Sequence, residues 1–296
     1  MLIWPDCIHC ILRMSLNTSR IIIKNKDQVR QFIEQILKLK ALKGEDWKVT
    51  SPEIIRDVWR IINKVSGLDD PLKKIKKEQN DAALKIYPFA KRFISESYDP
   101  FLEALKFSIA GNSIDLMTGE TKKPKKDIIK KLQQFAIKEE NIKGLKERLN
   151  KTRRLVYLGD NCGEIVFDRL LIETIMDNYD LEITFVTRKF PVLNDATLSD
   201  ALYVGMDKMD KVVRVIDNGI REPLPGTMLK KISPELKRLI DESDLVISKG
   251  GGNHDLLTEE SRLKGKTSFL LQAKCEPYRN IHKVPLLLGS LVVKNF

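Results

Sequence analysis

The residues with the clearest capacity for chemistry are an acid and an amide, Asp160 and Asn161, which directly follow the apolar run 155–158. That run is typical of a buried strand, and the helical spacing of apolar residues after Glu164 predicts a helix. The pair is therefore expected where a strand ends and a helix begins, which is where ligands bind in α/β sheets. Alternatively, Asp160 and Asn161 could form only a turn and a helix cap.

Polar groups also follow the other predicted strands. Because the carboxyl ends of parallel strands lie on one edge of a sheet, we expect these groups to converge there. Asp160, Asn161 and Asp195 would supply oxygen ligands of the kind that Mg²⁺, Mn²⁺ and similar ions prefer. Asp195 could instead cap a helix that begins near Thr197. The remaining groups are Arg188-Lys189, Asn194, Asp217-Asn218-Gly219, Lys249-Gly250-Gly251-Gly252-Asn253 and Lys274-Cys275.

The glycine-rich run between Lys249 and Asn253 is the candidate phosphate-binding segment. Its glycines would let backbone N–H groups approach an anion closely, and Lys249 would add a positive charge. A metal on one side and a phosphate cradle on the other is the layout of phosphoryl hydrolysis or transfer. A flexible turn is the alternative. The chain lacks the Walker motif G-x-x-x-x-G-K-[ST], and no G-x-G-x-x-G follows the first predicted strand.

A second group of reactive side chains consists of Cys7 and Cys10, in a C-x-x-C motif, and Cys275. These three residues could hold a second metal ion or act as a redox pair. They could also be ordinary thiols on a short helix. The chain has only four cysteines, unevenly placed, which argues against a disulfide framework.

Length and composition indicate a soluble globular protein of 296 residues, long enough for two domains. No apolar run approaches the roughly 18 residues that a membrane helix needs, and no N-terminal signal is evident, so we expect a cytoplasmic protein without membrane contact. The net charge of +11 would allow nucleic-acid binding. However, the excess lysines fall mainly within residues 73–92 and 122–154 without interleaved aromatics, which favours a solvated surface. Composition indicates no particular oligomeric state.

The pattern along the chain changes near residue 151. Residues 1–151 are expected to form a helical domain, and residues 152–296 alternate strands with helices. That alternation predicts a doubly wound, Rossmann-like, mostly parallel sheet, and thus an α/β fold with an N-terminal all-helical domain. The expected helices of the first domain are 7–16, 26–42, 54–65, 70–93, one beginning at 99, and 125–150. The expected strands are 155–158, 181–187, 212–216, 245–248, 268–273 and 291–294.

In these motifs the chain resembles the damage-control phosphatase family, formerly the domain of unknown function 89 family. The early C-x-x-C and the late Lys274-Cys275 are similar to its archaeal-type subfamily. His254 departs from the family pattern, because an aromatic residue is usual there. The matching segments are Pro5-Asp6-Cys7-Ile8-His9-Cys10, Gly111-Asn112-Ser113-Ile114-Asp115, Gly159-Asp160-Asn161-Cys162-Gly163-Glu164, Leu193-Asn194-Asp195-Ala196-Thr197, Lys249-Gly250-Gly251-Gly252-Asn253 and Lys274-Cys275.

The resemblance implies a metal-dependent phosphatase supported by Mn²⁺, Co²⁺, Ni²⁺ or Mg²⁺, acting on small phosphate esters such as sugar phosphates, nucleotides or damaged metabolites. It places the metal on Asp160, Asn161 and Asp195, and the substrate phosphate on the run from Lys249 to Asn253. We expect Asp160, Lys249 and Glu164 to be catalytic, and Arg188 and Asn112 to contact substrate. Water could attack directly, which we favour, or Asp160 could attack first.

The alternatives are an S-adenosylmethionine-dependent O-methyltransferase and, less favoured, a basic nucleic-acid-binding protein. A doubly wound domain with an acidic loop after its first strand can hold S-adenosylmethionine, and the resembled family also carries a carboxyl methyltransferase label. The missing glycine-rich loop after the first strand argues against that cofactor. The nucleic-acid alternative predicts steeply salt-dependent binding, but the sequence has no recognisable reading element.

Overall fold

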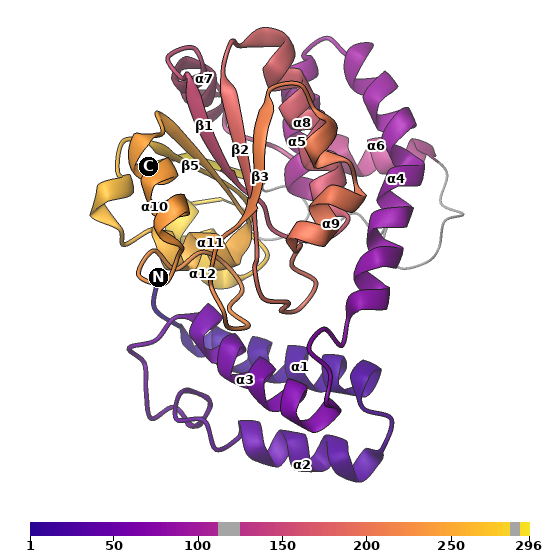
Figure 1. The fold of residues 1–296 in the computed structure, drawn as a ribbon, viewed down its shortest axis with the longest axis vertical. Coiled ribbons are helices and arrows are strands. Elements are labelled where there is room, and N and C mark those ends of the chain that lie inside the picture. Colours follow the sequence, from indigo (N-terminus) through magenta and orange to yellow (C-terminus); the bar gives the residue numbers. More distant parts are fainter. Residues whose placement is uncertain (112–124, 285–290) are drawn as a thin grey trace.

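The apolar runs of the second half form one six-stranded sheet in the computed structural model, which describes residues 1–111, 125–284 and 291–296 (Figure 1). The strand order is β3-β2-β1-β4-β5-β6, and all neighbours are parallel except β5 and β6. This arrangement confirms the predicted doubly wound, mostly parallel sheet. The strands are β1 (Arg154–Leu158), β2 (Glu182–Thr187), β3 (Val212–Asp217), β4 (Leu245–Lys249), β5 (Thr267–Gln272) and β6 (Leu291–Asn295).

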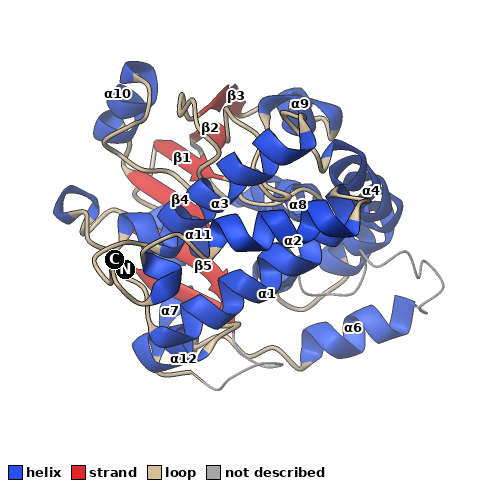
Figure 2. Ribbon diagram, turned by 90° about the horizontal axis from the view of Figure 1, so that it is seen from below, coloured by secondary structure: helices blue, strands red, loops and turns tan. Residues whose placement is uncertain are grey.

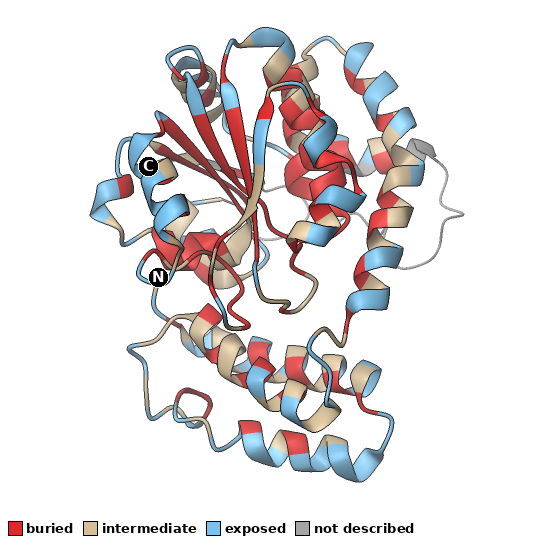
Figure 3. Cartoon of the chain, viewed as in Figure 1, coloured by how far each residue is buried: buried red, intermediate tan, exposed pale blue. Residues whose placement is uncertain are grey.

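Helices cover both faces of the sheet, which is why its central strands β1 and β4 are buried on both faces rather than on alternate residues (Figures 2 and 3). Successive side chains of a strand point to opposite faces. Leu155 and Tyr157 accordingly pack in one core with α8, whereas Val156 and Leu158 pack in another with α10. The helices of this half are α8 (Glu164–Asn178), α9 (Leu198–Tyr203), α10 (Pro234–Glu242), α11 (Gly250–Leu257) and α12 (Glu276–His282).

The described elements between Pro5 and Leu149 are helices, as predicted, and they fall into two groups. The first three pack around their own apolar core and form a layer below the sheet in Figure 1. The next four share the core of β1 and α8. The domain boundary at residue 151 remains a prediction. The helices are α1 (Pro5–Ile22), α2 (Lys26–Ile36), α3 (Ser51–Ser66), α4 (Lys73–Ser95), α5 (Pro100–Ala110), α6 (Lys125–Gln133) and α7 (Glu139–Leu149).

Several expected helices differ in extent. The helix expected over 26–42 ends at Ile36, and a short 3-10 turn follows and closes at Gly44, whose φ of 76° suits glycine. The helix expected over 125–150 is divided into α6 and α7, and Phe135 lies buried between them. Conversely, α1 extends well beyond 7–16, and α4 continues through Pro88. No described helix is long and apolar enough to cross a membrane.

Candidate active site

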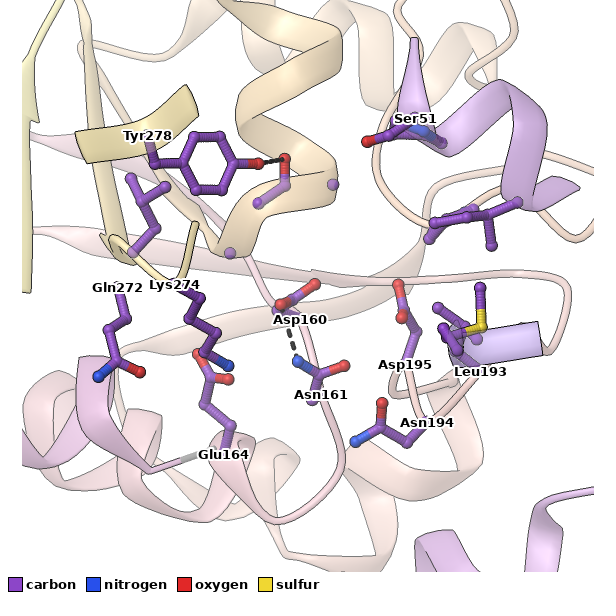
Figure 4. A pocket seen from close by; sticks show the side chains of 18 of the residues that line it. Ser51, Asp160, Asn161, Glu164, Leu193, Asn194, Asp195, Gln272, Lys274 and Tyr278 are labelled. Carbon is purple, nitrogen blue, oxygen red and sulfur yellow. Dashed lines mark hydrogen bonds between the residues drawn. The ribbon is translucent and has the colours of Figure 1, made fainter. Parts of the chain in front are cut away.

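A cavity of about 420 Å³ opens at the carboxyl ends of β1 and β4. These two central strands lie side by side, and the chain reverses its winding direction between them, which is where α/β folds bind ligands. One wall is polar and comes from the loops after β1, β2, β4 and β5 (Figure 4). The facing wall includes Met14 of α1 and Pro52 and Ile55 of α3. Asn112, predicted to contact substrate, lies outside the described residues.

The structure brings Asp160, Asn161 and Asp195 together on the polar wall (Figure 4). Arg188 lies behind them, only 1% exposed, and contacts both carboxylates. Its Nε donates to Asp195 Oδ2 at 2.7 Å, and its Nη2 donates to Asp160 Oδ1 at 3.1 Å. Asn161 Nδ2 donates to Asp160 Oδ2 at 2.9 Å. Arg188 thus orients the two acids; its predicted contact with substrate remains a prediction, and it is not among the cavity-lining residues.

Backbone pairing explains why two loops from different strands meet here. Asn161 and Asp195 form an antiparallel bridge. On either side of it, the Ala196 N–H donates to Asp160 O and the Cys162 N–H donates to Asn194 O, both at 2.8 Å. This pairing fixes the two loops relative to each other. None of Asp160, Asn161 and Asp195 caps either adjacent helix. The N-cap of α8 is Gly163, which makes no side-chain hydrogen bond, and the N-cap of α9 is Thr197.

The electrostatics of the site favour an added cation. Burial, with the nearby charges of Asp195 and Glu164, raises the pKa of Asp160 well above its usual range, although Arg188 opposes the shift. Burial also raises the pKa of Asp195 against the same arginine. Within the described chain, no group of three or more His, Cys, Asp or Glu side chains could hold a metal ion. This site supplies a different set of donors, two carboxylates and the amide of Asn161. Those hard oxygen donors do fit a divalent ion.

Lys249 is fully buried and does not line the cavity. Its Nζ lies 2.7 Å from Glu164 Oε1 and 2.6 Å from Asp168 Oδ1, and it donates to the backbone oxygen of Ser108 at 2.8 Å. Burial alone would lower the pKa of Lys249, but the two carboxylates outweigh it and the pKa is raised. Lys249 therefore holds Glu164, which does line the cavity. Its direct phosphate contact remains a prediction.

The glycine run is the first turn of α11 rather than a flexible loop. Gly250, Gly251 and Gly252 all line the cavity, and the first N–H groups of a helix have no partner within the helix. Gly250 has a φ of +77°, and a Cβ atom there would overlap Asp160 Oδ2. A Cβ at Gly252 would lie 2.8 Å from Pro225 O. Glycine is required because the helix start is packed directly against the acid.

The two residues after the glycines turn inward. Asn253 is fully buried, and its Nδ2 donates to Lys249 O at 2.8 Å and to Gly159 O at 3.2 Å, which ties α11 to the end of β1. Its predicted substrate contact remains a prediction. His254 packs edge-on against Tyr278, with ring centroids 5.2 Å apart. It does not line the cavity itself.

Sequence reasoning placed Lys274 at this edge of the sheet without assigning it a role in the site, and it did not place Tyr278; both line the cavity (Figure 4). Among its lining residues within the described chain, Lys274 alone carries a positive charge. The Tyr278 hydroxyl lies 2.9 Å from Asp255 Oδ1 and 3.1 Å from Gly251 O and can donate its one hydrogen to either, so it contacts the glycine turn. The signal for Lys274 was its position two residues beyond the end of β5, at the same edge as the other groups.

The three cysteines of the predicted second site lie at two different helices. Cys7 and Cys10 lie on α1 and Cys275 caps α12, and all are free thiols. Burial raises the pKa of Cys7, and it raises that of Cys275 to about 11, with a further contribution from nearby Cys7. Within the described residues these thiols form no group that could hold a metal ion. The second metal or redox site remains a prediction.

Comparison with known proteins agrees with this geometry. The family model of the damage-control phosphatase ARMT1-like domain matches residues 3–286. A damage-control phosphatase from Archaeoglobus fulgidus is 29% identical over 297 residues, which cover 99% of each chain. An uncharacterized protein from Methanocaldococcus jannaschii is 32% identical over 92% of this chain and 89% of the relative. The crystal structure of a DUF89 family protein from Pyrococcus horikoshii matches the full length of both chains with a TM-score of 0.85 and 27% identity. The chain therefore belongs to the damage-control phosphatase ARMT1-like family.

Proposed function

We propose that this protein is a metal-dependent phosphatase that hydrolyses small phosphate esters, such as sugar phosphates, nucleotides or damaged metabolites. The observation that carries the proposal is one cavity with two kinds of wall groups. Oxygen donors of Asp160, Asn161 and Asp195 line it next to the N-terminus of α11, and Lys274 also lines it. Relatives named damage-control phosphatases support it, and the C-x-x-C and Lys274-Cys275 motifs support placement in the archaeal-type subfamily.

The substrate phosphate is assigned to the start of α11. Backbone N–H groups of Gly250, Gly251 and Gly252 and the positive end of the helix dipole favour an anion there, and Lys274 adds a full charge. Asp160, Asn161 and Asp195 would hold Mn²⁺, Co²⁺, Ni²⁺ or Mg²⁺. When bound, such an ion lowers the pKa of a water molecule and neutralises charge on phosphoryl oxygens.

Glu164 is assigned to orienting the attacking water by accepting its hydrogen bond. Its carboxylate lines the cavity, and Lys249 fixes it from behind at 2.7 Å. Lys249 thus acts through Glu164 as a positioning residue. Direct attack by water is favoured over attack by Asp160, because both oxygens of that carboxylate already accept hydrogen bonds, from Arg188 and Asn161.

The test is hydrolysis of p-nitrophenyl phosphate by protein stripped with chelator and then given Mg²⁺, Mn²⁺, Co²⁺ or Ni²⁺ separately. We expect no turnover in chelator and restored turnover with at least one ion. The same ion should raise the thermal unfolding temperature, because it binds only the folded site. Full activity in chelator, or none with any ion, would contradict the proposal.

Substitution of Lys274 tests the phosphate assignment. We expect Lys274→Met to raise KM for the ester by about 10-fold or more, because a hydrogen bond to a charged group is worth about 1.5–3 kcal/mol. The folded structure should be unaffected, since Lys274 is exposed. Lys264→Met, at an exposed lysine outside the cavity, is the matched control. An unchanged KM in Lys274→Met would remove Lys274 from the site.

A further inference from the structure

We propose that one face of α4, formed by Lys76, Gln79 and Asn80, positions both catalytic loops and thereby sets the turnover rate. These three residues stand at i, i+3 and i+4, so they share one side of the helix. The inference rests on the proposed phosphatase function, because the loops it concerns carry the metal-ligand candidates. None of the three residues lines the cavity, so they would act through other groups.

Asn80 holds the loop after β1. It is fully buried, and its Oδ1 accepts the Gly163 N–H at 2.6 Å. Gly163 has a φ of 78° and lies between Asn161 and Glu164, so its peptide sets the direction in which the chain leaves the metal-ligand pair and enters α8. Only glycine adopts this conformation without strain, and the buried N–H of Gly163 needs a hydrogen-bond acceptor. Asn80 supplies that acceptor.

The same face of α4 holds the loop after β2. Gln79 Oε1 accepts from Asn194 Nδ2 at 3.2 Å, and Asn194 is the neighbour of Asp195 in the cavity wall. Lys76 is buried and forms an ion pair with Asp200 Oδ2 at 3.1 Å.

Asp200 in turn accepts hydrogen bonds from the backbone N–H and the hydroxyl of Thr197, at 2.9 and 2.6 Å. Lys76 also pairs with Asp70 at 2.7 Å. Thr197, the N-cap of α9 two residues beyond Asp195, is thereby anchored to α4.

Burial of these polar groups argues for a positioning role rather than simple packing. An amide and an ammonium group buried between helices cost free energy unless their partners are well placed, and apolar residues of similar size would pack at lower cost. The Asn80 Nδ2 atom has no hydrogen-bond partner among the described residues, so only its oxygen is used. These polar contacts fix the relative positions of two loops that follow different strands. Misplacement of reacting groups by about 1 Å can cost about 100-fold in rate.

The experiment compares wild type with Asn80→Leu, which keeps the side-chain size and removes the acceptor. With p-nitrophenyl phosphate and the activating ion, kcat per folded molecule should fall by about 10- to 100-fold while KM changes by less than about threefold. Asn80→Asp should recover most of the loss, since its carboxyl group keeps an accepting oxygen in either protonation state. Glu78→Gln, an exposed neighbour on the same helix, is the matched control and should equal wild type.

A second readout does not depend on activity. In metal-free protein, amide hydrogen exchange over residues 159–163 should accelerate in Asn80→Leu and not in Glu78→Gln. If Asn80→Leu does not fold, Gln79→Leu should show the same kcat loss, with faster exchange over residues 189–197. Wild-type kcat in the folded variant, or equal losses in Asn80→Leu and Asn80→Asp, would overturn the inference. If wild type has no phosphatase activity, the proposed function fails, and unchanged exchange would then separately overturn the positioning role.

Discussion

Replacing Asp160 by asparagine is expected to lower kcat for p-nitrophenyl phosphate by about a thousandfold or more. Asp160 contributes one of the two carboxylates of the oxygen-donor group, and it lies against the glycine turn of α11 where the phosphate is assigned. An amide has nearly the same shape, but it loses the charge and one of the two oxygens that accept from Arg188 and Asn161. Asp160→Ala should be equally inactive. Activity is measured with each divalent ion added after chelation, so that weakened metal affinity can be separated from slower turnover.

The same substitution is not expected to unfold the protein. Burial and neighbouring acids raise the pKa of Asp160, so the ionised group destabilises the metal-free fold above the carboxyl pKa of the unfolded chain. In chelator at pH 8, Asp160→Asn should therefore unfold at the same temperature as wild type or higher. That difference should shrink as the pH is lowered toward the unfolded carboxyl value near 3.8.

Asp217→Asn, at the end of β3 and outside the cavity, is the matched control. It should retain wild-type turnover. Turnover near wild type in both variants would remove Asp160 from catalysis.

Substitution of Gly250 by alanine is expected to reduce kcat by about 100-fold. The new methyl group would overlap Asp160 Oδ2, so either the carboxylate or the first turn of α11 must move. Both belong to the proposed site, one on the metal side and one on the phosphate side. The measurement is kcat and KM at saturating activating ion, with folding checked by circular dichroism.

Backbone strain alone would not produce this loss. A non-glycine residue at positive φ costs about 1–2 kcal/mol wherever it occurs, and Gly67→Ala provides that cost without a collision. Gly67 has a φ of +68° at the end of α3, and no atom lies within 4 Å of a Cβ built there. We expect Gly67→Ala to lower the unfolding temperature slightly and to keep full activity. Equal activity of both alanine variants would contradict the close packing of Gly250 on Asp160.

The sheet could be predicted from sequence because each strand is a local apolar run with β-branched residues, bounded by polar groups. The convergence of Asp160, Asn161 and Asp195 followed from the same logic, since parallel strands place their carboxyl ends on one edge. These inferences need only the period of the pattern and the direction of the chain.

The directions of individual side chains could not be predicted in this way. Lys249 is the last residue of β4, and Lys274 lies two residues beyond the end of β5, at the same edge of the sheet. The Lys249 amine is nevertheless buried between carboxylates, whereas Lys274 lines the cavity. The difference depends on Asp168, which α8 brings beneath β4 from a distant part of the sequence. The contacts of α4 with the two loops could not be predicted for the same reason, because Asn80 and Gly163 are 83 residues apart in the sequence.

The layer formed by α1, α2 and α3 has an apolar core distinct from the two cores that hold the sheet, and Val192 from the loop after β2 also packs into it. The layer nevertheless supplies Met14, Pro52 and Ile55 to one wall of the cavity. Substitutions at these three positions would alter the shape of the pocket without changing a residue of the carboxylate cluster or of the helix start. Substrate choice could therefore change in evolution while the residues assigned to the chemical step stay the same. Directed evolution toward new phosphate esters should begin with libraries at these positions.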